Sequence, residues 1–422
     1  MRFKIFLFFL FFVNAVFGQT FTVNSILYTI ISSSPNKVEV ASNNCFAGAL
    51  ILPTTVVNSG KTYTVSSIAG SAFYNCANLT SVSIPNTVTS IGSSAFALCS
   101  NLISVSIPNS VTTIGGSVFR NCISLTSITI PDSVTQILSN SFFKCTNLAL
   151  VNLGNSLTSI GNSAFSGCSN LNSIMIPNSV TIIGDSVFSG CLGLNSITIP
   201  NSVTTLGDSA FYNCTSLSSV SISNNLSSIG HSVFQNCTSL LSVSIPNSVT
   251  SIGNFAFNQC TNLASLSIPN SVNSIGLSAF ANCSSLSAVY CEIITPLVIN
   301  TDVFKFVNQD SCSLTVHNSS VNAYKSAANW KLFNPILGTP FLSVADSHFK
   351  NKLLIYPNPF QNEVFIEVKE IKENSIEIFD FSGKIVLKLK RKSSQQAIDT
   401  SILPKGTYLF KVGSSISKGI KK

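Results

Sequence analysis

Cysteine is the residue type in this chain that is most able to do chemistry. Ten cysteines recur at intervals of 23 residues: Cys76, Cys99, Cys122, Cys145, Cys168, Cys191, Cys214, Cys237, Cys260 and Cys283. Such thiols could form disulfides or bind a metal. A metal site is not expected, because no C-x-x-C pair occurs and the only histidines, His231, His317 and His348, are scattered along the chain.

The redox state of these cysteines follows from their regular spacing. Disulfides are chemically permitted in an exported protein, and equivalent positions on neighbouring strands approach to about 4.8 Å. Identical positions all point the same way, however, so a continuous column could pair only across alternate gaps. Cysteine also behaves as a small buried hydrophobe when nothing oxidises it. We therefore expect a column of mostly reduced, buried thiols.

Other catalytic signatures are missing from the sequence. It contains no G-x-S-x-G, no H-E-x-x-H and no phosphate-binding loop. Its many serines lack a neighbouring base, and a serine without one is only a polar surface residue. The sequence predicts no enzyme, no catalytic residue and no cofactor.

The strict period explains how these residues are positioned. Phenylalanines lie three residues before each cysteine, from Phe73 to Phe280, and leucines lie three residues after, from Leu79 to Leu286. A fixed period over more than 200 residues is typical of one small unit stacked repeatedly, each burying its apolar side against its neighbours. The fold class is therefore a repeat solenoid.

One coil shows the expected local structure. Val105 and Ile107 point inward from a short strand, Pro108 ends the strand because it has no N–H to donate, and Gly115 marks a second bend. The S-x-F-x-x-C stretch that follows the bend is long enough for a helical turn or two. Each coil is thus expected to combine a short parallel strand with a short helical turn.

The recurring pattern IPNSVTSIGxSAFxxCxxLxSVS resembles the BspA-like leucine-rich repeat. The L-x-x-V-x-I core matches the general leucine-rich repeat strand. I-P-N-S-V stands where leucine-rich repeats usually carry an asparagine, a departure that is the signature of the BspA-like subfamily. The resemblance covers residues 68–289, about ten repeats. It implies a right-handed solenoid of parallel strands used for adhesion or for binding other macromolecules.

The start of the chain indicates export. Arg2 and Lys4 precede an apolar run over residues 5–13, and a small-residue exit follows at residues 16–18. This is the pattern of a signal peptide over residues 1–18. A transmembrane anchor is the alternative, but it needs around 20 apolar residues and the run stops at Asn14.

Composition changes sharply after Phe349, since residues 350–422 hold 14 of the 23 Lys plus Arg. Segments 363–368, 375–379, 385–389 and 407–412 alternate or run apolar between turns, which predicts a small antiparallel β-sandwich. Y-P-N-P-F, F-D-F-S-G-K and L-P-K-G-T-Y resemble the C-terminal sorting domain of type IX secretion; a sugar-binding tail is the alternative. The motif residues are Tyr356, Pro357, Asn358, Pro359, Asp380, Gly383, Lys384, Gly406 and Tyr408.

This second resemblance implies where the protein works. It implies a Bacteroidetes protein, passage through the outer membrane by the type IX machinery, and removal of residues 350–422 by a surface protease. The mature chain is expected at the outer cell surface or in the medium, with no transmembrane segment.

The ends of the solenoid need caps, because an open end exposes apolar side chains and unpaired strand groups. Residues 19–67, with several strand-like segments, are expected to form a β-rich N-terminal cap. Residues 290–338 break the 23-residue period and are expected to form the C-terminal cap, followed by a linker at 339–349.

Charge gives a further constraint. The formal +8 divides into +2 in residues 1–18, −1 in residues 19–349 and +7 after Phe349, where 14 basic and 7 acidic residues lie. The central part is almost neutral, so it has no basic stripe to neutralise phosphates. Nucleic acid is therefore not an expected partner.

The candidate binding face consists of the outward positions on the strands. We call it the serine face: Ser104, Ser106, Ser127, Thr129, Leu150, Asn152, Ser173, Met175, Ser196, Thr198, Ser219 and Ser221. Leu150 and Met175 interrupt it and form a candidate apolar contact spot, although singly exposed apolar residues are normal. The expected partner is an unknown protein or glycan.

Three functions remain open at this stage: an adhesin or binding module, a passive spacer or coat, and an ice or crystal-surface binder that matches a lattice with flat Ser/Thr rows. D-S-V and D-S-A sequences also resemble the O-glycosylation acceptor of the same bacterial group, at Ser133, Ser186 and Ser209. The alternative for Asp185 and Asp208 is local, since an acidic side chain there would cap backbone N–H groups of a helical turn.

Overall fold

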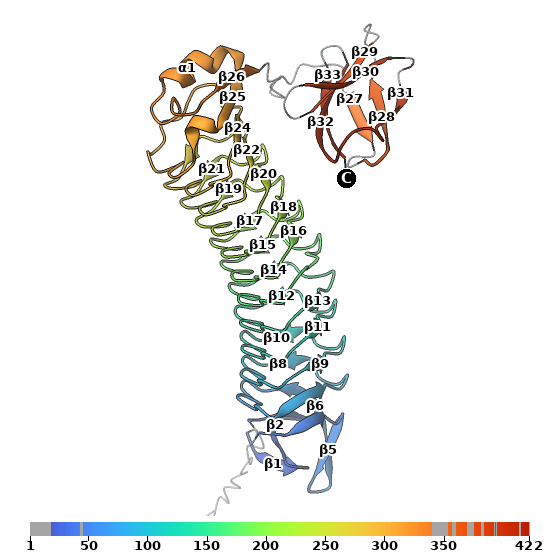
Figure 1. Cartoon of the computed structure of the whole chain (residues 1–422). Helices are drawn as coiled ribbons and strands as arrows, with labels where there is room; N and C mark the ends of the chain where they lie inside the picture. Colours follow the sequence, from blue (N-terminus) through green and yellow to red (C-terminus); the bar gives the residue numbers. More distant parts are fainter. Residues whose placement is uncertain are drawn as a thin grey trace, which may run out of the picture. The chain divides into compact units, whose positions relative to one another are not determined.

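The structure is a computed structural model that describes residues 18–42, 45–339, 353–356, 360–368, 375–380, 384–391, 393, 395–412 and 415–421. It divides into two compact units, one ending at Leu337 and the other beginning at Gly338 (Figure 1). The predicted signal peptide at residues 1–18 lies outside the described residues except for Gly18.

The first unit is a β-solenoid in which each coil contributes strands to two parallel columns. The first column carries the serine face and comprises β7 (Leu79–Ser83), β9 (Ser104–Ser106), β11 (Ser127–Thr129), β13 (Leu150–Asn152), β16 (Ser196–Thr198), β18 (Ser219–Ser221), β20 (Ser242–Ser244), β22 (Ser265–Ile268), β24 (Ala288–Cys291) and β25 (Ser313–His317). Within this column, neighbouring strands of the repeats pair in parallel in several short sheets, with a shift of 23 residues where they pair, as Ser81 does with Ser104. The predicted solenoid of parallel strands is confirmed.

A second column of two-residue strands runs along another side of the coils. It comprises β8 (Ser90–Ile91), β10 (Thr113–Ile114), β12 (Gln136–Ile137), β14 (Ser159–Ile160), β15 (Ile182–Ile183), β17 (Thr205–Leu206), β19 (Ser228–Ile229), β21 (Ser251–Ile252) and β23 (Ser274–Ile275). Two residues are too short to show strand alternation in a sequence, and this column was not predicted.

The third side of each coil differs from the expected helical turns. In the coil at Ser94, the S-x-F-x-x-C segment forms consecutive turns, with φ of 58° at Ser94 and 64° at Leu98. A positive φ at two points interrupts any right-handed helix. Alternate N–H groups instead reach the next coil, as Phe96 does to the carbonyl of Val118 at 2.9 Å, so this side also ties the coils together.

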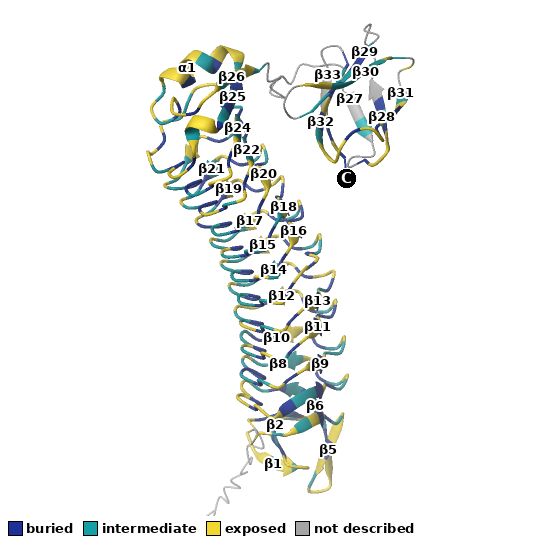
Figure 2. Ribbon diagram, viewed as in Figure 1, coloured by how far each residue is buried: buried dark blue, intermediate teal, exposed yellow. Residues whose placement is uncertain are grey.

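The core consists of columns of identical side chains. The rings of Phe73 through Phe280 stack in register, with centroid separations of 5.1 Å at the closest pair, Phe142 and Phe165, and 5.7 Å at the widest, Phe165 and Phe188. The glycines of the second bend are required by close approach: a Cβ at Gly115 or Gly207 would collide with the backbone of the preceding coil. Figure 2 shows buried and exposed residues alternating along the coils.

One coil departs from the strand pattern. Residues 171–177, which carry Ser173 and Met175, form no strand, although a strand was expected there. Ile174 and Ile176 still point inward and Ser173 and Met175 outward. The alternation persists because it is set by burial of the two isoleucines rather than by ladder hydrogen bonds.

Both ends of the solenoid carry irregular structure. The N-terminal strands are β1 (Thr20–Val23), β2 (Ile26–Ser33), β3 (Asn36–Val40), β4 (Gly48–Ile51), β5 (Thr55–Asn58) and β6 (Lys61–Ile68). Of these, β4 pairs with β7 of the first column, and β6 pairs with β8 of the second. The N-terminal strands therefore continue both columns and cover the first coil.

At the other end, the phenylalanine stack stops against aromatic edges. Phe304 stacks on Phe280 at 5.4 Å, and Phe333 meets Phe304 edge-on at 5.0 Å. The elements here are η1 (Gln309–Ser311), η2 (Asn318–Ser320), α1 (Val321–Ser326) and β26 (Ile336–Thr339).

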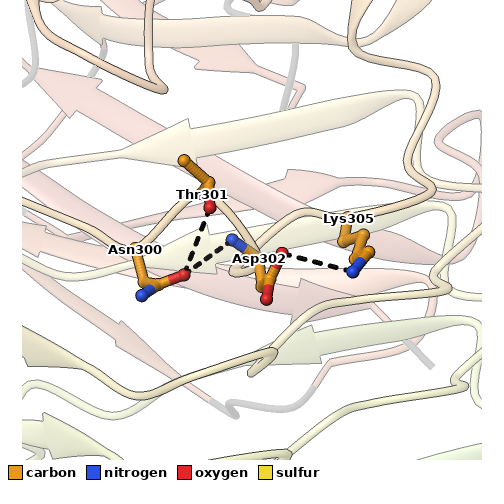
Figure 3. Close-up of polar contacts among 4 residues, drawn as sticks. All are labelled: Asn300, Thr301, Asp302 and Lys305. Atoms are coloured by element: carbon orange, nitrogen blue, oxygen red, sulfur yellow. Dashed lines mark hydrogen bonds and ion pairs between the residues drawn. The ribbon is translucent and has the colours of Figure 1, made fainter.

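The turn that leads to Phe304 is held locally, as Figure 3 shows. The side-chain oxygen of Asn300 accepts the N–H of Asp302 at 2.9 Å, and Lys305 pairs with the Asp302 carboxylate at 3.4 Å. These contacts shape the turn that brings Phe304 onto the stack.

The second unit is an antiparallel sandwich of two sheets. One contains β27 (Leu353–Tyr356), β28 (Glu363–Val368) and β31 (Gln395–Asp399); the other contains β29 (Ser375–Phe379), β30 (Ile385–Lys390), β32 (Gly406–Val412) and β33 (Ser415–Lys421). Their inner faces share a core that includes Phe360, Val364, Ile378 and Phe410. The predicted antiparallel strands are confirmed.

Candidate binding face

The serine face is a double row of side chains at equivalent positions in successive coils. Where strands pair, residues of one row lie directly beside each other, as Ser196 and Ser219 do in one row and Thr198 and Ser221 in the other. All twelve predicted residues are exposed. The N-terminal strand β4 extends both rows, because Ala49 pairs with Ser81 and Ile51 with Ser83.

Two large apolar side chains stand out on this face. Leu150 is 54% exposed and Met175 is 83% exposed, and they lie on adjacent coils in neighbouring rows. Leu150 pairs with Ser127, and Asn152 donates to the hydroxyl of Thr129 at 3.4 Å. The apolar spot is therefore flanked by small polar groups that leave its side chains accessible.

A second set of outward residues, which we call the threonine column, was missed by sequence reasoning. Each member directly precedes a second-column strand: Thr89, Thr112, Thr135, Thr158, Thr181, Thr204 and Thr250. Six of these hydroxyls donate to a backbone carbonyl of the preceding coil, as Thr158 does to Thr135 at 3.0 Å. The recurring Thr directly after I-P-N-S-V was a visible signal.

The cysteine column is buried, and from Cys99 to Cys283 its thiols are free and share one bonding pattern. The thiol of each cysteine from Cys99 to Cys283 donates to the carbonyl of the phenylalanine 26 residues earlier, at 3.0 to 3.3 Å. Burial raises the pKa of Cys145 and of Cys214 to about 12. These cysteines are free, as expected, and their thiols are held in the neutral form.

The aspartates next to the predicted glycosylation sites have a structural role. Asp185 accepts the N–H of Asp208 at 2.9 Å, and Asp208 accepts that of His231 at 2.7 Å. These carboxylates therefore cap the next coil rather than a helical turn.

The three serines at these sites are all half-buried. Ser133 also donates its hydroxyl to the carbonyl of Val111. Glycosylation at these positions stays a prediction, to be checked by the intact mass of the exported protein.

Among the described residues, no group of three or more His, Cys, Asp or Glu is placed to hold a metal ion. Over the same residues, no helix has the length and apolar character needed to cross a bilayer.

The described sorting-motif residues lie at turns of the second unit or in the strands beside those turns. Asp380 accepts the N–H of Lys384 at 3.1 Å, and Tyr408 donates its hydroxyl to the carbonyl of Pro404 at 2.6 Å. Tyr356 ends β27, and Gly406 begins β32 with φ of 156°. Residues 357–359 and Gly383 lie outside the described residues.

A family model for the BspA-type leucine-rich repeat region matches residues 66–195 and 181–309. The chain belongs to this family. A second model, for the secretion system C-terminal sorting domain, matches residues 354–422. This BspA-type protein is therefore a leucine-rich repeat surface protein with a type IX sorting tail, exported to the cell surface or secreted.

Solved structures include similar bacterial repeat proteins. A leucine-rich cell surface protein from Faecalibacterium prausnitzii is 27% identical, with 65% of this chain and 94% of that chain covered and a TM-score of 0.37. A leucine-rich repeat protein from Bacteroides ovatus is also 27% identical, with 64% and 94% covered and a TM-score of 0.36. No curated protein matches this chain.

Proposed function

We propose that this protein is a non-catalytic binding protein that engages a protein or glycan at the cell surface through its serine face. The observation that carries the proposal is the exposure of all twelve residues of the face at equivalent positions of successive coils. The described side chains of these rows make one bond, from Asn152 to Thr129. The remaining hydroxyls of the face are left to donate to and accept from a ligand.

The absence of formal charge on the serine face defines the partner that it suits. Its outward side chains are small hydroxyls, one amide and the apolar pair Leu150 and Met175. A neutral face of this kind fits uncharged sugar hydroxyls or a polar peptide surface, and the apolar pair offers a local anchor. Buried apolar anchors within a polar surround often dominate binding energy.

Binding is tested with the purified full chain on glycan and protein arrays. A ligand found there is then titrated against Leu150→Ser and Met175→Ser. Because each substitution removes an apolar side chain from the contact, affinity should fall by about tenfold. The matched control is Ile182→Ser on β15, since Ile182 is 47% exposed outside the serine face and should leave affinity unchanged.

A passive spacer is the second candidate, and the threonine column favours it. Hydroxyls that bond each coil to its predecessor stiffen the solenoid without serving a ligand. If the protein is a spacer, no glycan or protein on the arrays should bind it. Deletion of whole 23-residue coils should then shorten the solenoid without loss of any binding. Equal effects of Leu150→Ser and Ile182→Ser would also count against the serine face as the binding surface.

A further inference from the structure

The cysteine column changes at its first member. Nine repeat thiols donate to the carbonyl of a phenylalanine in the preceding coil, beginning with Cys99 and Phe73. Cys76 belongs to the first coil, and the residue 26 positions before it is Leu50 rather than a phenylalanine. Another thiol, that of Cys45 from the N-terminal strands, lies in contact with Cys76 instead.

The backbone holds these two cysteines close together. Immediately after Cys45, the N–H of Gly48 donates to the carbonyl of Asn78 at 2.8 Å, and β4 then pairs with β7. The Cys45 thiol is 3.5 Å from the carbonyl of Asn75, the residue next to Cys76, and the two thiols hydrogen-bond to each other. The proximity is thus fixed by the backbone pairing that follows each of the two cysteines, at Gly48 with Asn78 and at β4 with β7.

The two thiols differ in exposure. Cys45 is exposed and lines a hollow of about 540 Å³ with Thr22, Leu27 and Phe46, whereas Cys76 is fully buried. Burial, and next the hydrogen bond with Cys45, raises the pKa of Cys76 to about 12. An oxidant that approaches from solvent therefore reaches Cys45 first.

We propose that Cys45 and Cys76 form a disulfide in the exported protein, which ties the N-terminal strands covalently to the first coil. Export supplies the oxidising compartment in which such bonds persist. The remaining repeat thiols are excluded from the reaction because each is buried and bonded to a phenylalanine carbonyl.

The oxidant is a disulfide of an exported thiol–disulfide oxidoreductase. The Cys45 thiolate attacks one sulfur of that disulfide, forms a mixed disulfide and releases the other oxidant sulfur as a thiolate. Cys76 then gives up its proton and attacks the Cys45 sulfur, which releases the second oxidant thiolate. The two electrons and two protons lost by the cysteine pair convert the oxidant to its dithiol.

Thiol counting tests the proposal on the full chain exported to an oxidising periplasm. The cells are quenched in acid, and the protein is unfolded without reductant, alkylated and weighed. The expected mass shows two unalkylated residues among the 13 cysteines, and a peptide map should join the peptides that contain Cys45 and Cys76. Full alkylation, or a link between any other pair, would overturn the proposal.

Two variants sharpen the count. Cys45→Ser changes an exposed residue, so the chain should still fold, and every remaining cysteine should become alkylated. Cys99→Ser, in the bonded column, should retain the two protected residues. Two protected cysteines in Cys45→Ser would contradict the assignment.

A proteolysis measurement gives a second readout. Lys61 is exposed in the loop closed by the proposed bond, so reductant should speed tryptic cleavage there by about tenfold or more. Cys45→Ser should be cut at the fast rate with or without reductant. Unchanged cleavage of the reduced wild-type chain would contradict a clamping role for the bond.

Discussion

The serine face and the threonine column both consist of small hydroxyl side chains on the outside of the same coils, yet their bonds differ. Six threonine hydroxyls donate to the backbone of the preceding coil, as Thr158 does, whereas Thr198 on the serine face makes no such bond in the described structure. Thr158 and Thr198 are the same type of residue. What decides whether a hydroxyl is structural or available is the position of its column relative to the carbonyls of the neighbouring coil.

The cysteine column supports the same rule from inside the coil. Its thiols lie beside the phenylalanine carbonyls and donate to them, for example Cys191 to Phe165 at 3.2 Å. A polar group in a repeat protein is therefore used repeatedly in one way, because translation by one coil reproduces its surroundings. The comparison between columns can be tested by substituting one residue in each column and measuring the change in the free energy of unfolding.

The largest cost is expected inside the coil. Phe188→Ala should lower the free energy of unfolding by about 3 to 5 kcal/mol, because it leaves a cavity in the ring stack. Phe188 is fully buried and lies between Phe165 and Phe211 at 5.7 and 5.4 Å. Denaturant unfolding measures this change, and a loss as small as that of a serine-face variant would reverse the inward and outward assignments.

A strong dependence on alkaline pH is expected from the cysteine column. Thiols that ionise near pH 9 in the unfolded chain have a pKa of about 12 when folded, as at Cys145 and Cys283, because burial disfavours the thiolate. Above about pH 9 the unfolded chain thus binds fewer protons than the folded chain. Stability should therefore fall as pH rises from about 9 to 12, by up to about 1.4 kcal/mol per pH unit for each thiol.

Denaturant midpoints over this pH range, measured with reductant present, check the dependence. Cys214→Ala removes one of the thiols and should make the decline shallower, although it also lowers stability at neutral pH. A midpoint that does not move between pH 9 and 12 would show that the column is not held as neutral thiols.

The sequence predicted the columns that repeat with apolar residues and missed those that depend on backbone conformation. Phe188 and Cys191 were placed inside because burial imposes a residue type at every coil. The turns around Ser94 were expected to be helical, since their spacing is equally compatible with a helical turn. The left-handed conformation at Ser94 and Leu98 depends on bonds to the next coil, which no local pattern reveals.

The candidate site, like the fold, was predicted only in part. Outward exposure of Leu150 and Met175 followed from alternation, but the strand expected at residues 171–177 was absent. The contact of Cys45 with Cys76 could not be foreseen, because Cys45 lies outside the 23-residue period. Contacts between the repeats and the irregular ends require the three-dimensional path of the chain.

A moderate cost is expected in the threonine column. Thr158→Val keeps the side-chain shape but removes the hydroxyl that donates to Thr135 at 3.0 Å, and it leaves that carbonyl with only its backbone donor. The free energy of unfolding should fall by about 0.5 to 1.5 kcal/mol. An unchanged denaturant midpoint would show that the hydroxyl bond contributes nothing to the stacking of the coils.

The smallest cost is expected on the serine face, where Thr198→Val makes the same chemical change as Thr158→Val. Thr198 is exposed on β16 and its hydroxyl bonds to no neighbouring coil in the described structure, so stability should change by no more than about 0.5 kcal/mol. Ser196→Ala in the adjacent row should behave alike. If Thr198→Val lowered the free energy of unfolding as much as Thr158→Val, the hydroxyls of the serine face would be stabilising the solenoid. The proposal that they are available to a ligand would then be wrong.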